Sequence, residues 1–185
     1  MAEIFLALIH HPVVDRNGRI ITSAITSLDL HDIARSSRTY GVRALYVVHP
    51  VAQQREFARG VIDHWHIGHG RSFDSRRVEA LDLIEIVADL DAAVAATERA
   101  AGRRPAIVHT SAREKKGMSF AAMRELIAQA DTPPILILLG TGFGLAPAAR
   151  ERVDLALEAI RGAGDYNHLS VRAAASIILD RLRGR

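Results

Sequence analysis

Short apolar runs alternate with amphipathic segments along the whole chain. Runs typical of buried strands cover residues 4–9, 44–48, 83–87, 106–108, 135–139 and 153–157. Helical patterns, several with a capping residue, cover 27–40, 53–65, 90–101, 119–130, 146–152 and 171–182. The polar stretches 11–26 and 66–75 contain Pro or Gly, and we expect them to be loops. Strands that alternate with helices predict an α/β fold with a mostly parallel sheet and helices on both faces.

Length and composition suit one globular domain over residues 1–185, since no repeat or Pro/Ser-rich linker divides the chain. Apolar residues make up 49% and charged residues 24% of the sequence, yet no apolar run is long enough to cross a membrane as a helix. The N-terminal residues read as a first strand and not as a signal peptide. The absence of cysteine excludes disulfides and thiolate metal sites, and we expect a cytoplasmic location.

The basic residues are almost all arginines. Lys115 and Lys116 are the only lysines among 24 basic residues, although the net charge is just +3. Arginine pairs with phosphate through two parallel hydrogen bonds, so this composition is compatible with RNA binding. A GC-rich genome, which encodes arginine freely, explains the same bias, and both interpretations stay open.

Three loops that follow predicted strands contain the candidate chemistry: residues 109–113, 140–144 and 164–170. Glycine at a strand end exposes backbone N–H and C=O groups at the sheet edge, where α/β proteins bind small molecules. Gly140-Thr141-Gly142 is only a fragment of a dinucleotide fingerprint: the helix after it is short, and no βαβ unit with an acidic residue about twenty positions on follows. Glycines that serve only as turn residues are the structural alternative.

These segments resemble motifs of the SPOUT superfamily of S-adenosylmethionine-dependent RNA methyltransferases. Residues 30–42 look like the first SpoU-type motif, a helix with an arginine followed by aromatic-Gly-Val. Residues 138–145 look like the second motif, a strand with a Gly-rich loop, and residues 167–175 look like the third. The resemblance covers essentially the whole chain. Residues 109–113 together with residues 164–170 are similar to motifs of a bacterial branch of this superfamily, whose members are small single domains.

The resemblance implies a C-terminal trefoil knot, a homodimer whose active site the partner completes, S-adenosylmethionine as cofactor and tRNA or rRNA as substrate. Two departures bear on the target. The third motif lacks the usual Ser-Leu-Asn order, and Phe143-Gly144 stands where many relatives carry an acidic residue. These departures put a ribose 2′-hydroxyl target in doubt and leave base methylation open.

The resemblance also assigns roles to individual residues. Cofactor contacts are expected from residues of the three loops and their flanks: Thr110, Ser111, Leu139, Gly140, Thr141, Gly142, Leu145, Asn167, His168, Leu169, Ser170 and Ala174. Arg35 matches the motif-one arginine and is the candidate catalytic residue, although it also reads as a solvated helix arginine paired with Asp29 or Asp32. Arg38, His10 and Arg113 are candidate substrate contacts, by position near the expected site.

No metal site is expected. His64, His66 and His69 lie close together, but their spacing matches no common zinc motif and no second ligand cluster follows. We therefore expect the loop 68–71 to cover the site or contact RNA. The leading hypothesis is an RNA methyltransferase. An inactive RNA-binding module with the same fold and a nucleotide-binding regulator are the alternatives.

Overall fold

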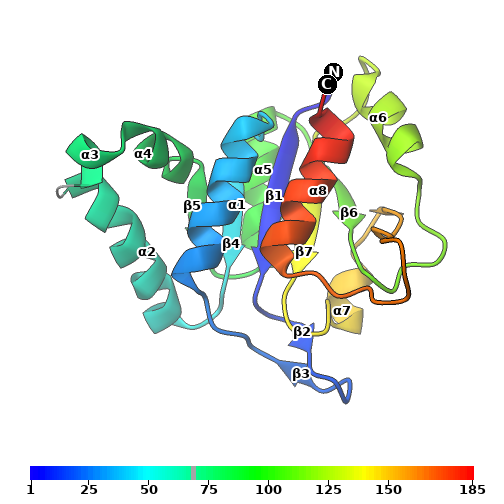
Figure 1. The fold of residues 1–185 in the computed structure, drawn as a ribbon, viewed down its shortest axis with the longest axis horizontal. Helices are drawn as coiled ribbons and strands as arrows, with labels where there is room; N and C mark the ends of the chain where they lie inside the picture. The colour runs from blue at the N-terminus through cyan, green and yellow to red at the C-terminus, as the bar shows by residue number, and fades with distance from the viewer. Residues whose placement is uncertain (68–69) are drawn as a thin grey trace.

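A parallel β-sheet forms the centre of the molecule in the computed structural model, which describes residues 1–67 and 70–185 (Figure 1). Within the described residues the sheet has six strands in the order β5-β4-β1-β7-β6-β8, and every pairing is parallel. The strands are β1 (Ile4–Ile9), β4 (Leu45–Val48), β5 (Ile84–Val87), β6 (Ala106–His109), β7 (Ile135–Gly140) and β8 (Leu155–Ala156). The predicted α/β class is confirmed, with each predicted strand in place.

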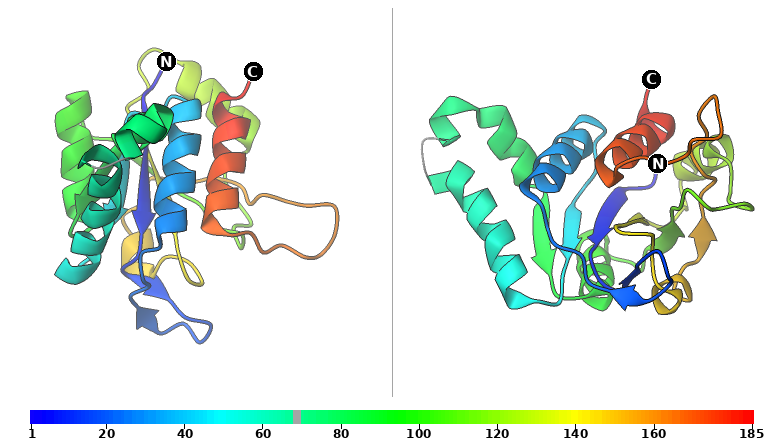
Figure 2. Two further views of the ribbon diagram at one scale, coloured as in Figure 1. Left: turned by 60° about the vertical axis from the view of Figure 1, so that its left-hand side comes forward. Right: turned by 60° about the horizontal axis from the view of Figure 1, so that its bottom comes forward.

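Helices cover both faces of this sheet (Figure 2). They are α1 (Ser27–Thr39), α2 (Ala52–Ile67), α3 (Gly70–Phe73), α4 (Ser75–Leu81), α5 (Leu90–Ala101), α6 (Phe120–Ala128), α7 (Pro147–Arg150) and α8 (Val171–Arg183). Buried side chains of α1, α4, α6 and α8 form the core on one face, and those of α5 and α7 form it on the other. None of the described helices is both long and apolar enough to cross a membrane.

Strand β1 shows why the central runs are apolar without a break. Ile4, Leu6 and Leu8 point to the first core, whereas the residues between them point to the second. All residues of β1 are fully buried, because helices cover the strand on both sides. Burial of each large apolar side chain contributes about 1.5–3 kcal/mol, so a polar residue within this run would be costly.

The chain reverses its path at the centre of the sheet. From β1 it moves outward through β4 to β5, then α5 carries it across the opposite face to β6, and β7 inserts between β6 and β1. The carboxyl ends of β1, β7 and β6 therefore lie side by side at the point where the strand order reverses. Such a switch point is the usual ligand-binding position in an open α/β sheet.

Two predicted loops contain regular structure. Residues 11–26 hold an antiparallel hairpin of β2 (Val13–Val14) and β3 (Ile20–Ile21), in which the side chain of Asp15 accepts two turn N–H groups. The segment 66–75 contains the end of α2 and the short helix α3. Helix α4 begins at the end of this segment, and no sequence pattern predicted it. Part of the loop predicted over 68–71 falls at residues 68–69, which lie outside the described residues.

Candidate functional site

Three segments from the second half of the chain meet around one cavity of about 640 Å³ at the carboxyl end of the sheet. This volume is within the range of about 300–1,000 Å³ that is usual for small-molecule sites. The cavity is lined by Ser23, Ala24, Asp29, Thr110, Ser111, Ala112, Arg113, Leu139, Gly140, Thr141, Gly142, Phe143, Gly144, Glu158, Ile160, Arg161, Asn167, His168, Leu169, Ser170, Val171, Ala174 and Ile178. The three predicted strand-end loops are therefore brought together.

Hydrogen bonds to the end of β1 hold the loop after β7 in place. Thr141 donates both its backbone N–H and its hydroxyl to the carbonyl of Ile9, at 3.2 and 3.0 Å. Gly142 has φ of +59° and approaches the carbonyl of Val14 so closely that an added Cβ would lie 3.0 Å from it. A side chain at residue 142 is disfavoured on both counts. Glycine there lets the loop turn beneath the cavity.

The segment after β6 is tied to both other loops. The Thr110 hydroxyl donates to the carbonyl of Leu138 at 2.8 Å, which joins this segment to β7. The side-chain amide of Asn167 donates to the carbonyl of Ala112 at 3.1 Å, which joins it to the loop before α8. These hydrogen bonds are long-range in sequence, so the cavity walls are held in register by the fold.

The segment after β8 brings a carboxylate to the cavity. Leu157 continues from β8 and pairs with Met118, so the chain runs directly alongside the segment before α6. Glu158 accepts the backbone N–H of Phe120 at 2.7 Å and lines the cavity. Gly117 permits this approach, since an added Cβ would lie 2.4 Å from the backbone of Leu157.

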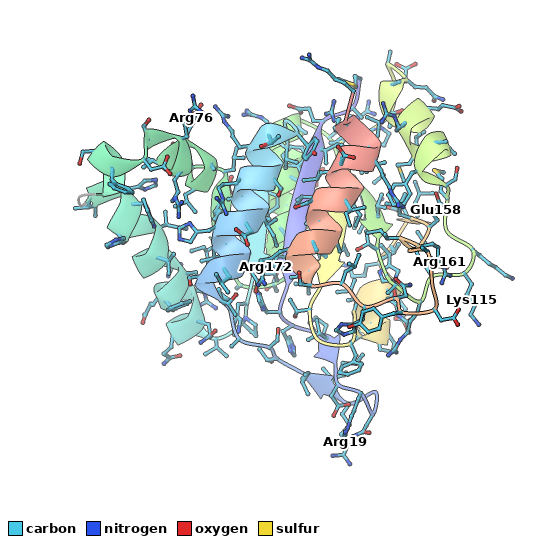
Figure 3. All side chains as sticks on the ribbon, viewed as in Figure 1. Arg19, Arg76, Lys115, Glu158, Arg161 and Arg172 are labelled. Atoms are coloured by element: carbon cyan, nitrogen blue, oxygen red, sulfur yellow. The ribbon has the colours of Figure 1, made fainter. Side chains whose placement is uncertain are left out.

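A network of charged side chains joins α1 to the first turn of α8 beside the cavity. Arg172 contacts Asp29 at 3.0 Å and Asp32 at 3.4 Å, and Asp32 also pairs with Arg35. The side chain of Asp29 is only 10% exposed and also accepts the hydroxyl of Thr26, the residue that caps α1. Arg172 lies near the centre of the side-chain view (Figure 3). The network positions the ends of both helices at the site.

His10 is fully buried behind the cavity wall. Its Nδ1 lies 2.9 Å from the hydroxyl of Ser23, which in turn lies 2.5 Å from the hydroxyl of Thr141. Its Nε2 has no hydrogen-bond partner among the described residues. Burial, with the nearby imidazole of His49 adding to it, lowers the pKa of His10 to about 4 from 6.5, against a small opposing effect of Asp29.

We expect this histidine to make the protein less stable in mild acid. The folded state holds neutral His10, whereas the unfolded chain binds a proton near pH 6.5, so the contribution is complete above pH 6.5 and is lost as the pH falls to about 4. One pKa unit corresponds to ~1.4 kcal/mol, so the loss is up to about 3 kcal/mol. Urea unfolding at pH 7 and pH 4.5 measures it. His10→Asn should flatten the pH dependence and the exposed control His168→Asn should not; equal curves for all three proteins contradict the assignment.

Most of the predicted cofactor contacts meet at the cavity. The exception is Leu145, which is buried beneath Gly140 and does not line it. Of the predicted substrate contacts, Arg113 lines the cavity, with its guanidinium 5.8 Å from the centre of the Phe143 ring. Arg38 instead pairs with Glu79, away from the cavity.

Several lining residues carry no sequence signal of their own. Asp29 reads as an ordinary first-turn acid, and Ser23 belongs to a stretch interpreted as loop. Three further lining residues follow the short edge strand β8: Glu158, Ile160 and Arg161. Only the general rule that ligands bind at the carboxyl ends of parallel strands could have predicted them. No group of metal-binding side chains occurs in the described parts of the chain, and His66 pairs with Asp82 at 2.9 Å. His69 lies outside them.

Comparison with known proteins identifies relatives along the full chain. A family model described as "SAM-dependent RNA methyltransferase" matches residues 3–184. A tRNA (guanine-N(1)-)-methyltransferase of Nitratidesulfovibrio vulgaris is 42% identical over 182 residues, 98% of this chain but only 42% of that protein. An uncharacterized protein of Aquifex aeolicus is 40% identical over 184 residues, 99% of this chain and 89% of that protein.

A solved structure shares the fold. The SpoU methyltransferase AviRb of Streptomyces viridochromogenes, in complex with AdoMet, has a TM-score of 0.56 at 20% identity, over 98% of this chain and 56% of that chain. At this identity the likeness speaks for the fold alone. The chain thus spans less than half of the N. vulgaris relative, so more than half of that protein lies outside the matched segment.

Proposed function

Because this chain belongs to the family of S-adenosylmethionine-dependent RNA methyltransferases, we propose that it transfers a methyl group from S-adenosylmethionine to a nucleotide of tRNA. The observation that carries the proposal is the convergence of the three strand-end loops on one cavity. The tRNA substrate is supported by the N. vulgaris relative, which is named for tRNA. Its named activity is that of a longer protein, so the guanine-N1 position is not carried over.

The lining of the cavity suits S-adenosylmethionine. Leu139, Leu169 and Ile178 give it apolar walls for an adenine ring, and the loop after β7 lends backbone N–H and C=O groups. The cofactor carries a sulfonium and an ammonium group, and the carboxylates of Asp29 and Glu158 lie in the same lining. The lining also holds Arg113 and Arg161, so charges of both signs are present for the sulfonium, ammonium and carboxylate groups of the cofactor.

The bound cofactor supplies an already activated methyl group. The protein then has to hold donor and acceptor in line and exclude water, which needs rigid walls more than acid–base groups. Thr110, Thr141 and Asn167 provide that rigidity through their long-range hydrogen bonds. We assign the cofactor contacts as predicted, with Leu145 supporting Gly140 from beneath.

Arg35 is our candidate for the group that acts on the target nucleotide. Its side chain is half-exposed and forms an ion pair with Asp32. Asp32 also pairs with Arg172, and Arg172 pairs with Asp29 in the cavity wall. A guanidinium there can hold a target phosphate or stabilise negative charge on the attacking atom. Arg113 and Arg38 are proposed to hold RNA further out, and His10 to support Ser23 from behind.

The finer architecture is also proposed. Helix α8 packs between α1 and α6 after the outward loop 158–170 returns to the body (Figure 2). The trefoil knot that the family resemblance implies is part of this proposal, and the hydrogen bond from Asn167 to the carbonyl of Ala112 brings the loop before α8 against the segment between β6 and α6. The half-buried apolar residue Ile177 on α8, which lies outside the cavity lining, suits a homodimer interface. We expect the protein to act in the cytoplasm, where tRNA is modified.

Calorimetry with S-adenosylmethionine tests the cofactor assignment. We expect saturable binding with one site per chain and a Kd in the micromolar range, on the order of −8 kcal/mol. ATP and NAD at the same concentrations serve as controls and should give no binding. Binding of either nucleotide in preference to S-adenosylmethionine would favour a nucleotide-binding regulator, and no heat from the folded protein with any ligand would remove the proposal.

A further inference from the structure

The β2–β3 hairpin projects beyond the carboxyl end of the sheet, against the loop that follows β7 (Figure 1). It is attached rigidly to the cofactor loop. The N–H of Val14 donates to the carbonyl of Gly144, and the N–H of Phe143 donates back to the carbonyl of Val14, both at 2.9 Å. Val13 also bridges to Leu145. Anything held by the hairpin is therefore held at a fixed place relative to the cavity.

Several exposed cations on the hairpin and on the loops near the cavity have unpaired side chains. Within the described residues no ion pair and no side-chain donor bond is formed by the basic groups of Arg16, Arg19, Lys115, Lys116 and Arg161. The carboxylates beside them in sequence bind backbone N–H groups and not these side chains: Asp15 accepts those of Asn17 and Arg19, and Glu114 accepts those of both lysines.

These cations lie on two sides of the cavity. Arg19 extends from the hairpin at the lower end of the molecule, whereas Lys115 and Arg161 lie at its right-hand side (Figure 3). By contrast, Arg35 and Arg38 on α1 each have a carboxylate partner. Basic side chains that no ion pair holds are free to contact the phosphates of a polyanion that approaches the opening.

We propose that the β2–β3 hairpin is an RNA-binding element, in which Arg16 and Arg19 hold phosphates of the substrate RNA on one side of the cavity while Lys115 and Lys116 hold the strand on the other. The inference rests on the proposed function for the identity of the polyanion. Arginine suits this role because its planar guanidinium binds phosphate through two donors at once. Phosphate contacts fix the position of the RNA without reading its bases. Ile20, which follows Arg19 in sequence and is 58% exposed, offers an apolar contact for a ribose or base.

The test compares two double variants in the binding of bulk tRNA without cofactor, across a series of salt concentrations. Arg16→Gln/Arg19→Gln removes the hairpin charges. Arg59→Gln/Arg76→Gln is the matched control, since both arginines are exposed on α2 and α4 and form no ion pair in the described structure. We expect the hairpin variant to bind about tenfold more weakly and the salt slope to fall by about 2, one for each lost phosphate contact. The control should behave as wild type, and Arg16→Lys/Arg19→Lys should keep the slope.

Calorimetry with S-adenosylmethionine completes the test. An unchanged cofactor Kd in the hairpin variant shows that the fold and the cavity are intact. Wild-type tRNA affinity and salt slope in the hairpin variant would overturn the proposal, as would an equal loss in the control or conversion of a dimer to a monomer on sedimentation. Failure of the wild-type protein to bind the cofactor would instead contradict the proposed function. The tRNA-binding measurements would still test the hairpin proposal, because they contain no cofactor.

Discussion

Ala174→Trp is expected to abolish binding of S-adenosylmethionine. Ala174 lies in the first part of α8, is half-buried and lines the cavity, so an indole at this position would occupy the space that the cofactor needs. A ligand that must displace a packed side chain loses several contacts at once, and we expect at least ~100-fold weaker affinity, about 3 kcal/mol. Calorimetry gives the affinity, and thermal unfolding reports on the fold.

The matched control for this substitution is Ala121→Trp, at an exposed position of α6. It should bind the cofactor as wild type does. The smaller substitution Ala174→Leu should give an intermediate loss, which guards against an unfolded tryptophan variant. Wild-type affinity in folded Ala174→Trp would place the cofactor elsewhere.

Arg35→Ala is expected to lower methyl transfer about 100-fold and to leave the Kd for S-adenosylmethionine unchanged. The guanidinium lies outside the cavity lining and is linked to it through Asp32 and Arg172, so its loss should affect the target and not the cofactor. A residue that assists proton removal or stabilises developing charge typically contributes 10²- to 10⁴-fold. Initial rates with labelled cofactor and tRNA measure the loss.

Arg43→Ala is the control for Arg35. Arg43 is a comparably exposed arginine in an ion pair with Glu3, at the opposite end of the strands. Its loss should leave the rate within about twofold, since an exposed ion pair contributes little. A wild-type rate in Arg35→Ala would contradict the functional assignment. It would favour the alternative interpretation, in which Arg35 is a solvated helix residue paired with Asp32.

The buried framework could be predicted from the sequence because its physical cause is local. β1 and β7 are covered on both faces, so their residues form short unbroken apolar runs, as buried parallel strands do. Ser119 was predicted to cap the helix α6, and its hydroxyl does accept the N–H of Ala122 at 3.1 Å. The strand-end rule then placed the cavity correctly along the chain.

The hairpin and the ion pairs of Arg172 could not be predicted in this way, although the pair of Arg35 with Asp32 was among the interpretations. β2 and β3 hold two residues each, and their place depends on hydrogen bonds from Val14 to the distant loop after β7. Asp29 looks like a helix-start residue until α8 brings Arg172 against it. Both features arise from pairs of residues that are far apart in sequence, for which a local pattern carries no signal.

The central claim is that this cavity presents a methyl donor to RNA, and transfer of label tests it most directly. Purified protein is incubated with methyl-labelled S-adenosylmethionine and with tRNA from a strain that lacks the gene, and the tRNA is then digested to nucleosides. We expect label in one modified nucleoside, absent when Ala174→Trp replaces the wild type. Retention of tRNA by the folded protein with no label in any nucleoside would contradict the claim and indicate an RNA-binding module that has lost catalysis.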